Sequence, residues 1–191
     1  MVCGHNEFVS QVDNRWIGAS GGIGLETVRL FLGKLFHCLS KAVEIHLTFK
    51  YTEEGAKVTA QYNKNRSSLV PLCEKYSELR LVHADVTSEA DVSKLFAVVN
   101  SDRPAQVLVL IHGLWPTTDI QLGDMSLEQW NHTIATNLTS NFMLARGYLN
   151  ALKSLSDIQK SKASIVMVGS TAGKYGEAGH SDYASAKSGK K

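Results

Sequence analysis

Two side chains in the last ten residues of the sequence are spaced for proton transfer. Tyr183 and Lys187 stand four positions apart, so on a helix they share one face. A fixed ammonium stabilises a neighbouring phenolate, which makes a tyrosine a better proton donor and acceptor near neutral pH. The pair therefore predicts a general acid–base tyrosine, although the spacing alone also fits a solvated helix face.

A serine precedes this pair at the expected end of a strand. Ser170 comes just after the apolar run 164–168 and before Thr171-Ala-Gly173. Open α/β sheets bind ligands beyond the carboxyl ends of their strands. We therefore expect the Ser170 hydroxyl on the ligand side of the sheet.

A glycine-rich turn lies in the N-terminal part of the chain. The segment Gly18-Ala-Ser-Gly-Gly22-Ile-Gly24 precedes a helical pattern that opens at Leu25. Backbone N–H groups at a helix N-terminus bind a pyrophosphate, and a β-carbon would block its approach. An ordinary loop is the alternative. The dinucleotide site predicted here consists of Gly18, Ser20, Gly22, Ile23 and Gly24.

The elements that must position these groups alternate between strand-like and helix-like segments. Strands are predicted at 42–49, 79–83, 106–111 and 164–168. Alternation of this kind favours an α/β fold with a parallel sheet. The last two runs are almost continuously apolar, which is typical of strands covered by helices on both faces.

Two helices begin at sequences that resemble capping boxes, Ser88-Glu-Ala-Asp91 and Ser126-Leu-Glu-Gln129. The second continues as a long helix with one apolar stripe. Such a stripe predicts core packing or a subunit interface rather than a ligand site. Its members are Ile134, Leu138, Phe142, Ala145, Leu149 and Leu152.

Two segments fit this scheme poorly. Residues 11–17, which precede the glycine-rich turn, make a poor strand for the centre of a sheet, and 1–17 as a whole is irregular. Residues 33–42 contain no clear turn before the next strand. An insertion or a mis-spliced reading frame is one hypothesis for this stretch.

Taken together, the turn and the C-terminal residues resemble the short-chain dehydrogenase/reductase family. Gly18-x-x-x-Gly22-Ile-Gly24 is similar to the cofactor turn of that family, with Ile17 where threonine is usual. The resemblance implies that Ser170 binds a substrate carbonyl, that Tyr183 moves the proton, and that Lys187 also binds the nicotinamide ribose.

A fourth position on the long helix completes the family pattern. Asn137, in Ala135-Thr-Asn-Leu138, matches the asparagine that supports a water-mediated proton relay to the lysine. By itself it also fits an amide on a helix face. The predicted catalytic set is therefore Asn137, Ser170, Tyr183 and Lys187.

The same resemblance implies further cofactor contacts. Asp85, with Val86 beside it, matches the aspartate that contacts the adenine amino group, and a loop aspartate is the alternative. Gly113 matches the last residue of the family's Asn-Asn-Ala-Gly turn, which approaches the cofactor closely. Ile111 and His112 depart from that turn, and we interpret His112 as a structural replacement.

The cofactor preference should be encoded at the end of the second strand, where an acid binds ribose hydroxyls and a base binds a 2′-phosphate. After 42–49 stands Lys50 with no acid. NADP is therefore favoured, with NAD possible because Glu53 and Glu54 follow closely.

The spacing of the tyrosine and lysine also indicates the reaction. Enoyl reductases of the superfamily separate these residues more widely, so the resemblance favours a ketone and a secondary alcohol as small-molecule substrates. Trp115 and Pro116, just after Gly113, are expected to line the substrate side.

The fold implied is a single NAD(P)-binding domain over residues 1–191. It is a doubly wound, Rossmann-type parallel sheet in three α/β/α layers. Members of the family continue beyond the catalytic lysine, so we expect a domain incomplete at its C-terminus, which lacks the last strands and exposes 164–168 as a sheet edge. A homo-oligomer or association through that edge is one expectation.

Composition favours an ordinary globular protein. Of the 191 residues 43% are hydrophobic and 20% charged, with a net charge of +2, which argues against nucleic-acid binding. We expect no membrane span and, without a visible signal peptide, a cytoplasmic location. Cys3, Cys38 and Cys73 match no metal-site spacing, so no metal is expected.

Three hypotheses remain open at this point. The chain is an active NAD(P)-dependent oxidoreductase, a catalytically inactive nucleotide-binding fragment, or an interaction module that recruits a relative. Turnover of a ketone with NADPH favours the first, cofactor binding without turnover the second, and a stable heteromer the third.

Overall fold

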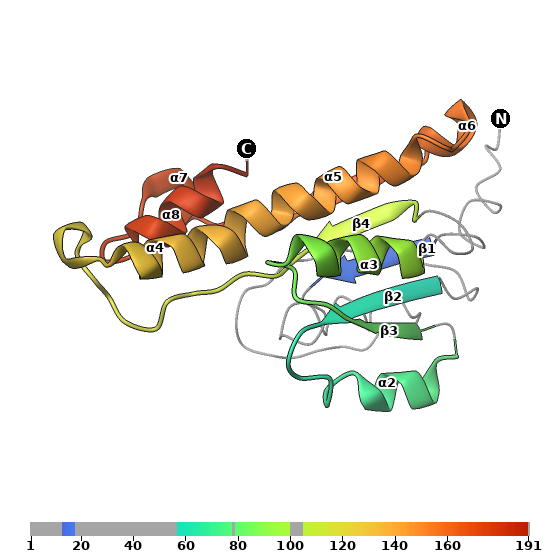
Figure 1. Cartoon of the computed structure of the whole chain (residues 1–191), viewed down its shortest axis with the longest axis horizontal. Helices are drawn as coiled ribbons and strands as arrows, with labels where there is room; N and C mark the ends of the chain where they lie inside the picture. Colours follow the sequence, from blue (N-terminus) through green and yellow to red (C-terminus); the bar gives the residue numbers. More distant parts are fainter. Residues whose placement is uncertain (1–12, 18–56, 78, 100–104, 191) are drawn as a thin grey trace, which may run out of the picture.

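The computed structural model describes residues 13–17, 57–77, 79–99 and 105–190 (Figure 1). Within them, five strands form one parallel sheet in the order β3-β2-β1-β4-β5. The strands are β1 (Asp13–Ile17), β2 (Lys57–Tyr62), β3 (Leu79–His83), β4 (Val107–Leu110) and β5 (Ser164–Met167). The chain reverses its direction of travel through the sheet between β3 and β4, which confirms the doubly wound parallel sheet.

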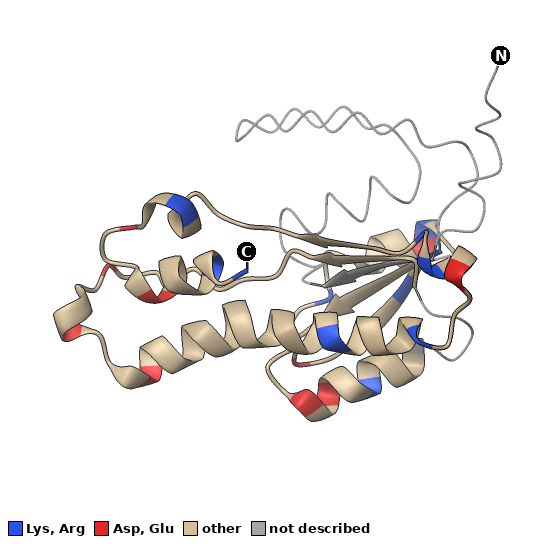
Figure 2. Ribbon diagram, turned by 90° about the horizontal axis from the view of Figure 1, so that it is seen from above, with Lys and Arg blue, Asp and Glu red and all other residues tan. Residues whose placement is uncertain are grey.

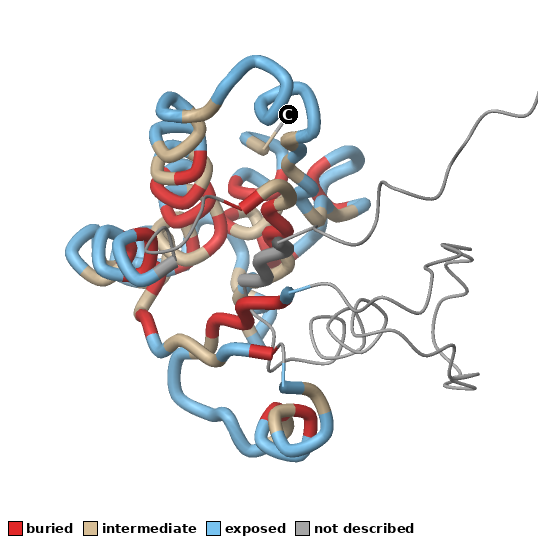
Figure 3. The backbone as a smooth tube through the Cα atoms, turned by 90° about the vertical axis from the view of Figure 1, so that its right-hand side faces the viewer, coloured by how far each residue is buried: buried red, intermediate tan, exposed pale blue. Residues whose placement is uncertain are grey.

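Helices cover both faces of this sheet. On one face α3 (Glu89–Val99) and α5 (Ser140–Leu152) pack on Leu108 and Leu110. On the other, α2 (Val70–Lys75) packs in a cluster that includes Val109. Neighbouring residues of β4 thus face opposite layers, as the pleat requires. Buried residues accordingly gather between the layers (Figure 3), and the three-layer expectation is confirmed.

The central strand is the one that the sequence made least convincing. β1 pairs with β2 on one side and with β4 on the other. The expectation that 11–17 is a poor strand for a sheet centre was therefore wrong. Its sequence, Asp-Asn-Arg-Trp-Ile, begins with two residues that are rare in strands, but two flanking ladders satisfy its backbone groups whatever the side chains are.

The second strand also differs from the sequence expectation. Residues 42–49 lie outside the described residues. The strand between β1 and β3 is β2, at 57–62. Its sequence, Lys-Val-Thr-Ala-Gln-Tyr, is less apolar than that of 42–49, yet residues 58–61 are all buried. Burial of β2 thus follows from its place between two strands rather than from a strongly apolar sequence.

The long helix is divided by an irregular turn. Helix α4 (Leu127–Ile134) runs through a π-helical turn, η2 (Ala135–Thr139), into α5. Ser126 caps its start, accepting a bond from the N–H of Gln129 at 3.1 Å, and Ser88 caps α3 in the same way through Asp91 at 3.3 Å. Both predicted helix starts are confirmed.

The apolar stripe of this helix does not form its core face. Phe142 is 59% exposed and Leu149 is 53% exposed. The residues that α5 buries are Ser140, Asn141, Met143, Leu144 and Tyr148. The core part of the expectation was wrong for Phe142 and Leu149, because the π-helical turn inserts an extra residue and rotates the following helix relative to the pattern that precedes it. Their role in an interface stays a prediction.

The remaining elements are short. They are η1 (Leu122–Asp124), α6 (Asp157–Lys160), α7 (Ala172–Tyr175) and α8 (Ser181–Ser188). Helices α4, α7 and α8 gather at one end of the molecule, beyond the tip of β4 (Figure 1). Strand β5 forms one edge of the described sheet, next to β4, and its Val166 is 48% exposed.

Charge is dispersed over the described part of the chain. Lys and Arg residues stand singly on α5, α7 and α8 (Figure 2). No described helix is long and apolar enough to cross a membrane. Among the same residues, no three His, Cys, Asp or Glu side chains are grouped to hold a metal ion.

Candidate active site

The predicted proton-transfer pair lies on α8. Lys187 is only 5% exposed, and its Nζ lies 5.4 Å from the ring centroid of Tyr183. The same Nζ donates a long hydrogen bond of 3.4 Å to the carbonyl of Val168, just after β5. Tyr183 itself is half-buried. Helical spacing thus brings the ammonium to the phenol, as the sequence predicted.

Ser170 lies where β5 gives way to α7. Its Oγ accepts a hydrogen bond from the N–H of Ala172 at 3.2 Å, which fixes the hydroxyl at the N-terminal end of α7. Since β4 and β5 are parallel, Ser170 stands at the same edge of the sheet as the residues that follow β4. This is the ligand side of an open α/β sheet.

Asn137 is fully buried in the π-helical turn and fastens the chain after β4. Its Oδ1 accepts from the N–H of Leu114 at 3.0 Å, and its Nδ2 donates to the Leu114 carbonyl at 2.9 Å. Irregular turns of this kind often occur at functional sites. The Asn137 carbonyl accepts a bond of 2.8 Å from the side-chain amide of Asn141, a contact that the sequence analysis missed.

Gly113 lies between Asn137, in η2, and Lys187, on α8. A β-carbon at this position would stand 2.8 Å from Asn137 Oδ1 and 3.2 Å from Lys187 Nζ. Only glycine fits here without displacing one of them. Three residues singled out in the sequence, Gly113, Asn137 and Lys187, are therefore brought together by the fold.

A buried polar contact that the sequence analysis did not identify holds α8 against α4. Asp182 has no exposed surface. Its Oδ2 accepts from Thr133 Oγ1 at 2.8 Å and from Gln129 Nε2 at 3.2 Å. The available signals were the position of Asp182 next to Tyr183 and of Thr133 one turn before Asn137.

His112, interpreted from the sequence as a structural replacement, lies beside this site. Its Nε2 lies 2.7 Å from Ser140 Oγ. Burial, followed by the positive charges of Lys190 and Lys187, lowers the pKa of His112 to about 3. The imidazole is therefore neutral at neutral pH. Burial, followed by the positive charge of Lys187, lowers the pKa of Lys190 to about 7.

An aromatic cluster adjoins the phenol of Tyr183. The Trp115 ring lies 4.7 Å from the Tyr183 ring and 4.0 Å from that of His180. His180 Nε2 lies 2.9 Å from Asp119 Oδ1. Trp115 was expected on the substrate side, whereas His180 and Asp119 were missed because no sequence spacing links them.

The predicted adenine residues lie at the end of β3. Val86 is buried. Asp85 accepts from the hydroxyl and the N–H of Thr87, at 2.7 and 2.9 Å, and these bonds, partly opposed by burial, lower the pKa of its carboxyl. The carboxylate is thus ionised and fixed at the same edge of the sheet as the C-terminal ends of β1 and β4.

The other predicted cofactor contacts belong to the N-terminal part of the chain. Gly18, Ser20, Gly22, Ile23, Gly24 and Lys50 lie outside the described residues. Their roles stay predictions. The strand next to β1 is β2, and two exposed basic residues, Lys64 and Arg66, follow it.

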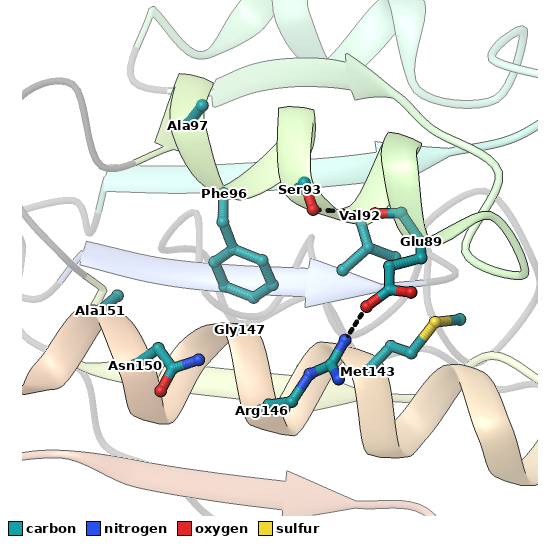
Figure 4. A pocket seen from close by; sticks show the side chains of 10 residues that line it. All are labelled: Glu89, Val92, Ser93, Phe96, Ala97, Met143, Arg146, Gly147, Asn150 and Ala151. Carbon is teal, nitrogen blue, oxygen red and sulfur yellow. Dashed lines mark hydrogen bonds and ion pairs between the residues drawn. The ribbon is translucent and has the colours of Figure 1, made fainter.

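A surface pocket of about 660 Å³ lies elsewhere, between α3 and α5 (Figure 4). Phe96, Met143 and Gly147 line its floor, and the ion pair between Glu89 and Arg146 spans one end. It contains none of the predicted catalytic residues. The chemistry-bearing groups are instead those around α8.

Comparison with curated proteins places this geometry in context. The 3-oxoacyl-[acyl-carrier-protein] reductase FabG of Salmonella typhimurium is 30% identical over 173 residues, 90% of this chain and 60% of the relative. The (3R)-3-hydroxyacyl-CoA dehydrogenase of Mus musculus is 34% identical over 108 residues, 56% of this chain and 39% of the relative. The chain thus spans about 60% of the length of the FabG relative.

Solved structures show the same fold. An NADPH complex of a variant actinorhodin polyketide ketoreductase has a TM-score of 0.72 at 25% identity, covering 94% of this chain and 60% of that one. A short-chain dehydrogenase/reductase from Brucella melitensis has a TM-score of 0.70 at 23% identity, covering 93% and 64%. A family model described as short chain dehydrogenase matches residues 45–191, well over half of the chain, so this protein belongs to the short-chain dehydrogenase family.

Proposed function

We propose that this protein is an NADP-dependent oxidoreductase that interconverts a ketone and a secondary alcohol. The observation that carries the proposal is the buried Lys187 ammonium, which lies 5.4 Å from the Tyr183 ring centroid and packs closely against Gly113. A nicotinamide cofactor would supply the hydride. The residues of this chain would supply position, charge and the proton.

Tyr183 would donate its proton to the carbonyl oxygen during reduction and accept it during oxidation. Lys187 would stabilise the phenolate left behind, since its ammonium faces the same ring. Ser170, fixed at the end of β5, would hold the carbonyl oxygen by a hydrogen bond. The fixed donors need no rearrangement during the reaction, which is the usual source of electrostatic catalysis.

Asn137 would position the backbone of the proposed cofactor site. Its side chain fastens Leu114 and thereby the turn at Gly113, against which a nicotinamide ribose would lie beside Lys187. A β-carbon at 113 would displace Asn137 Oδ1 or Lys187 Nζ. Glycine at this position thus keeps both side chains where the proposed nicotinamide site requires them.

The preference for NADP rests on the segment after β2. Lys64 and Arg66 are exposed at the carboxyl end of the strand next to β1, where a basic side chain favours the 2′-phosphate. The ketoreductase neighbour was solved with NADPH. Lys50 remains a second candidate for the same contact.

The test is oxidation of NADPH and NADH by the purified chain with simple ketones and with a small 3-oxoacyl thioester, the group in the name of the FabG relative. We expect turnover that is faster with NADPH. A cofactor-dependent rise in melting temperature without turnover of any of them would contradict the enzymatic proposal and favour a nucleotide-binding protein without catalysis.

A further inference from the structure

Trp115 is a large aromatic side chain left half exposed beside the predicted catalytic phenol. It is 47% exposed. Its ring meets that of Tyr183 at 4.7 Å between centroids and an interplanar angle of 78°, an edge-to-face contact. Part of the indole therefore remains open next to the group that must reach the substrate oxygen.

The indole of Trp115 packs against a buried histidine. His180 is only 3% exposed, and its ring lies 4.0 Å from the Trp115 ring at 46°. Asp119 fixes that imidazole through a 2.9 Å contact with Nε2. The N–H of Ile120 donates to the Gly179 carbonyl at 2.9 Å. The segment that follows β4 is thus fastened to the turn that opens α8.

We propose that Trp115 is a specificity-determining residue that selects carbonyl substrates with a planar aromatic substituent. The inference rests on the proposed function and names its substrate class. A carbonyl whose oxygen reaches Tyr183 has its substituent within reach of the open indole. An aryl ring gains from stacking or edge-to-face contact there, whereas a saturated ring of equal size gains only the buried area.

The experiment compares phenyl methyl ketone with cyclohexyl methyl ketone, which have the same carbon skeleton. We measure kcat/KM for both with NADPH. The wild-type chain is expected to prefer the phenyl ketone, and Trp115→Leu is expected to lower that preference roughly three- to tenfold. Trp115→Phe retains an aromatic face and should keep most of the preference. The loss should appear mainly in KM.

A matched control removes an exposed aromatic ring elsewhere. Phe142 is 59% exposed on α5 and lies against Arg146 instead. Phe142→Leu should leave the phenyl-to-cyclohexyl ratio unchanged. An unchanged or raised ratio in Trp115→Leu overturns the inference, as does an equal loss in Phe142→Leu.

A binding measurement separates this inference from the proposed function. The rise in melting temperature with each ketone, at equal concentration and saturating NADPH, does not require turnover. A larger rise with the phenyl ketone in wild type but not in Trp115→Leu supports the aromatic site even if no ketone is reduced. Equal shifts, or none, overturn the inference, while turnover alone decides the proposed function.

Discussion

The long central helix makes two contacts that differ in kind. Its C-terminal part, α5, meets α3 through apolar surface, where Gly147 lets the ring of Phe96 approach. Its N-terminal part, α4 with η2, meets α8 through hydrogen bonds from Thr133 and Gln129 to the buried Asp182. The first contact contributes buried area. The second restricts orientation, because a hydrogen bond weakens as its distance and angle leave a limited range.

We expect the two contacts to serve different purposes, one stability and the other activity. An apolar contact tolerates small rearrangements of the side chains that form it. A proton donor tolerates little displacement from its acceptor. The polar contact lies next to Tyr183 and Lys187 on α8, so variants there should affect activity, whereas variants between α3 and α5 should affect stability.

Removal of the Tyr183 hydroxyl is the strongest test of the contact between α4, η2 and α8. Tyr183→Phe should lower kcat at least about a hundredfold, because general acid–base catalysis is lost, with no change in melting temperature. Tyr175→Phe, at a tyrosine that is 75% exposed on α7, is the matched control. Ketone reduction and thermal unfolding measure both. Unchanged turnover in Tyr183→Phe would remove the basis of the mechanism.

Two glycine variants contrast the contacts directly. A β-carbon at Gly173 would stand 2.7 Å from the backbone carbon of Lys187, whereas one at Gly147 would stand 2.5 Å from the Phe96 ring. Alanine at 173 would therefore push against the backbone of α8 and shift the helix. Alanine at 147 would meet only the Phe96 ring, which can rotate away.

Each substitution to alanine should lower the free energy of unfolding by about 1–3 kcal/mol. Only Gly173→Ala should also lower kcat/KM, by about tenfold or more. Denaturant unfolding and kinetics measure the two effects. The contrast fails if Gly147→Ala lowers activity as much as Gly173→Ala does.

His112 should make the end of the fold that carries the predicted catalytic residues sensitive to acid. Its pKa is lowered to about 3 in the fold, whereas an unfolded histidine binds a proton near pH 6.5. Between these values the unfolded state binds more protons. The contribution of this residue is therefore complete above about pH 6.5 and is lost as the pH falls towards 3, at about 1.4 kcal/mol per pH unit.

The measurement is the free energy of unfolding of wild type and His112→Asn from pH 7 to pH 4. The other titrating groups are common to both proteins, so the difference between the two curves isolates the histidine. The wild type should lose stability more steeply than the variant. Parallel curves would show that the imidazole is not held neutral.

The smallest expected effect comes from Asp182. Asp182→Ala removes the acceptor for Thr133 and Gln129 and should cost about 1–2 kcal/mol of stability, with a fall in kcat because α8 loses its anchor. Asp182→Asn keeps one acceptor oxygen and should recover most of both. Thermal melts and turnover decide it, and full activity in Asp182→Ala would show that the polar contact does not position α8.

The positions of the predicted catalytic residues could be read from the sequence because their signals are local. The four-residue spacing of Tyr183 and Lys187 follows from helical geometry, and Ser170 follows an apolar strand. The central strand was missed because its composition gives no local signal, and its place depends on pairing with β2 and β4. The sequence placed the second strand at the more apolar 42–49, because β2 is only moderately apolar and its position depends on pairing with β1 and β3.

Periodicity and spacing along the chain were enough to predict the alternation of strands and helices and the shared helix face of Tyr183 and Lys187, whereas Gly113 was identified by resemblance to the family's turn. Only the packed fold shows which strand occupies the centre, that Asp182 anchors α8 to α4, and that Trp115, His180 and Asp119 form one cluster beside Tyr183. Those contacts join residues more than forty positions apart, and no local pattern encodes a contact that exists only once the layers have packed.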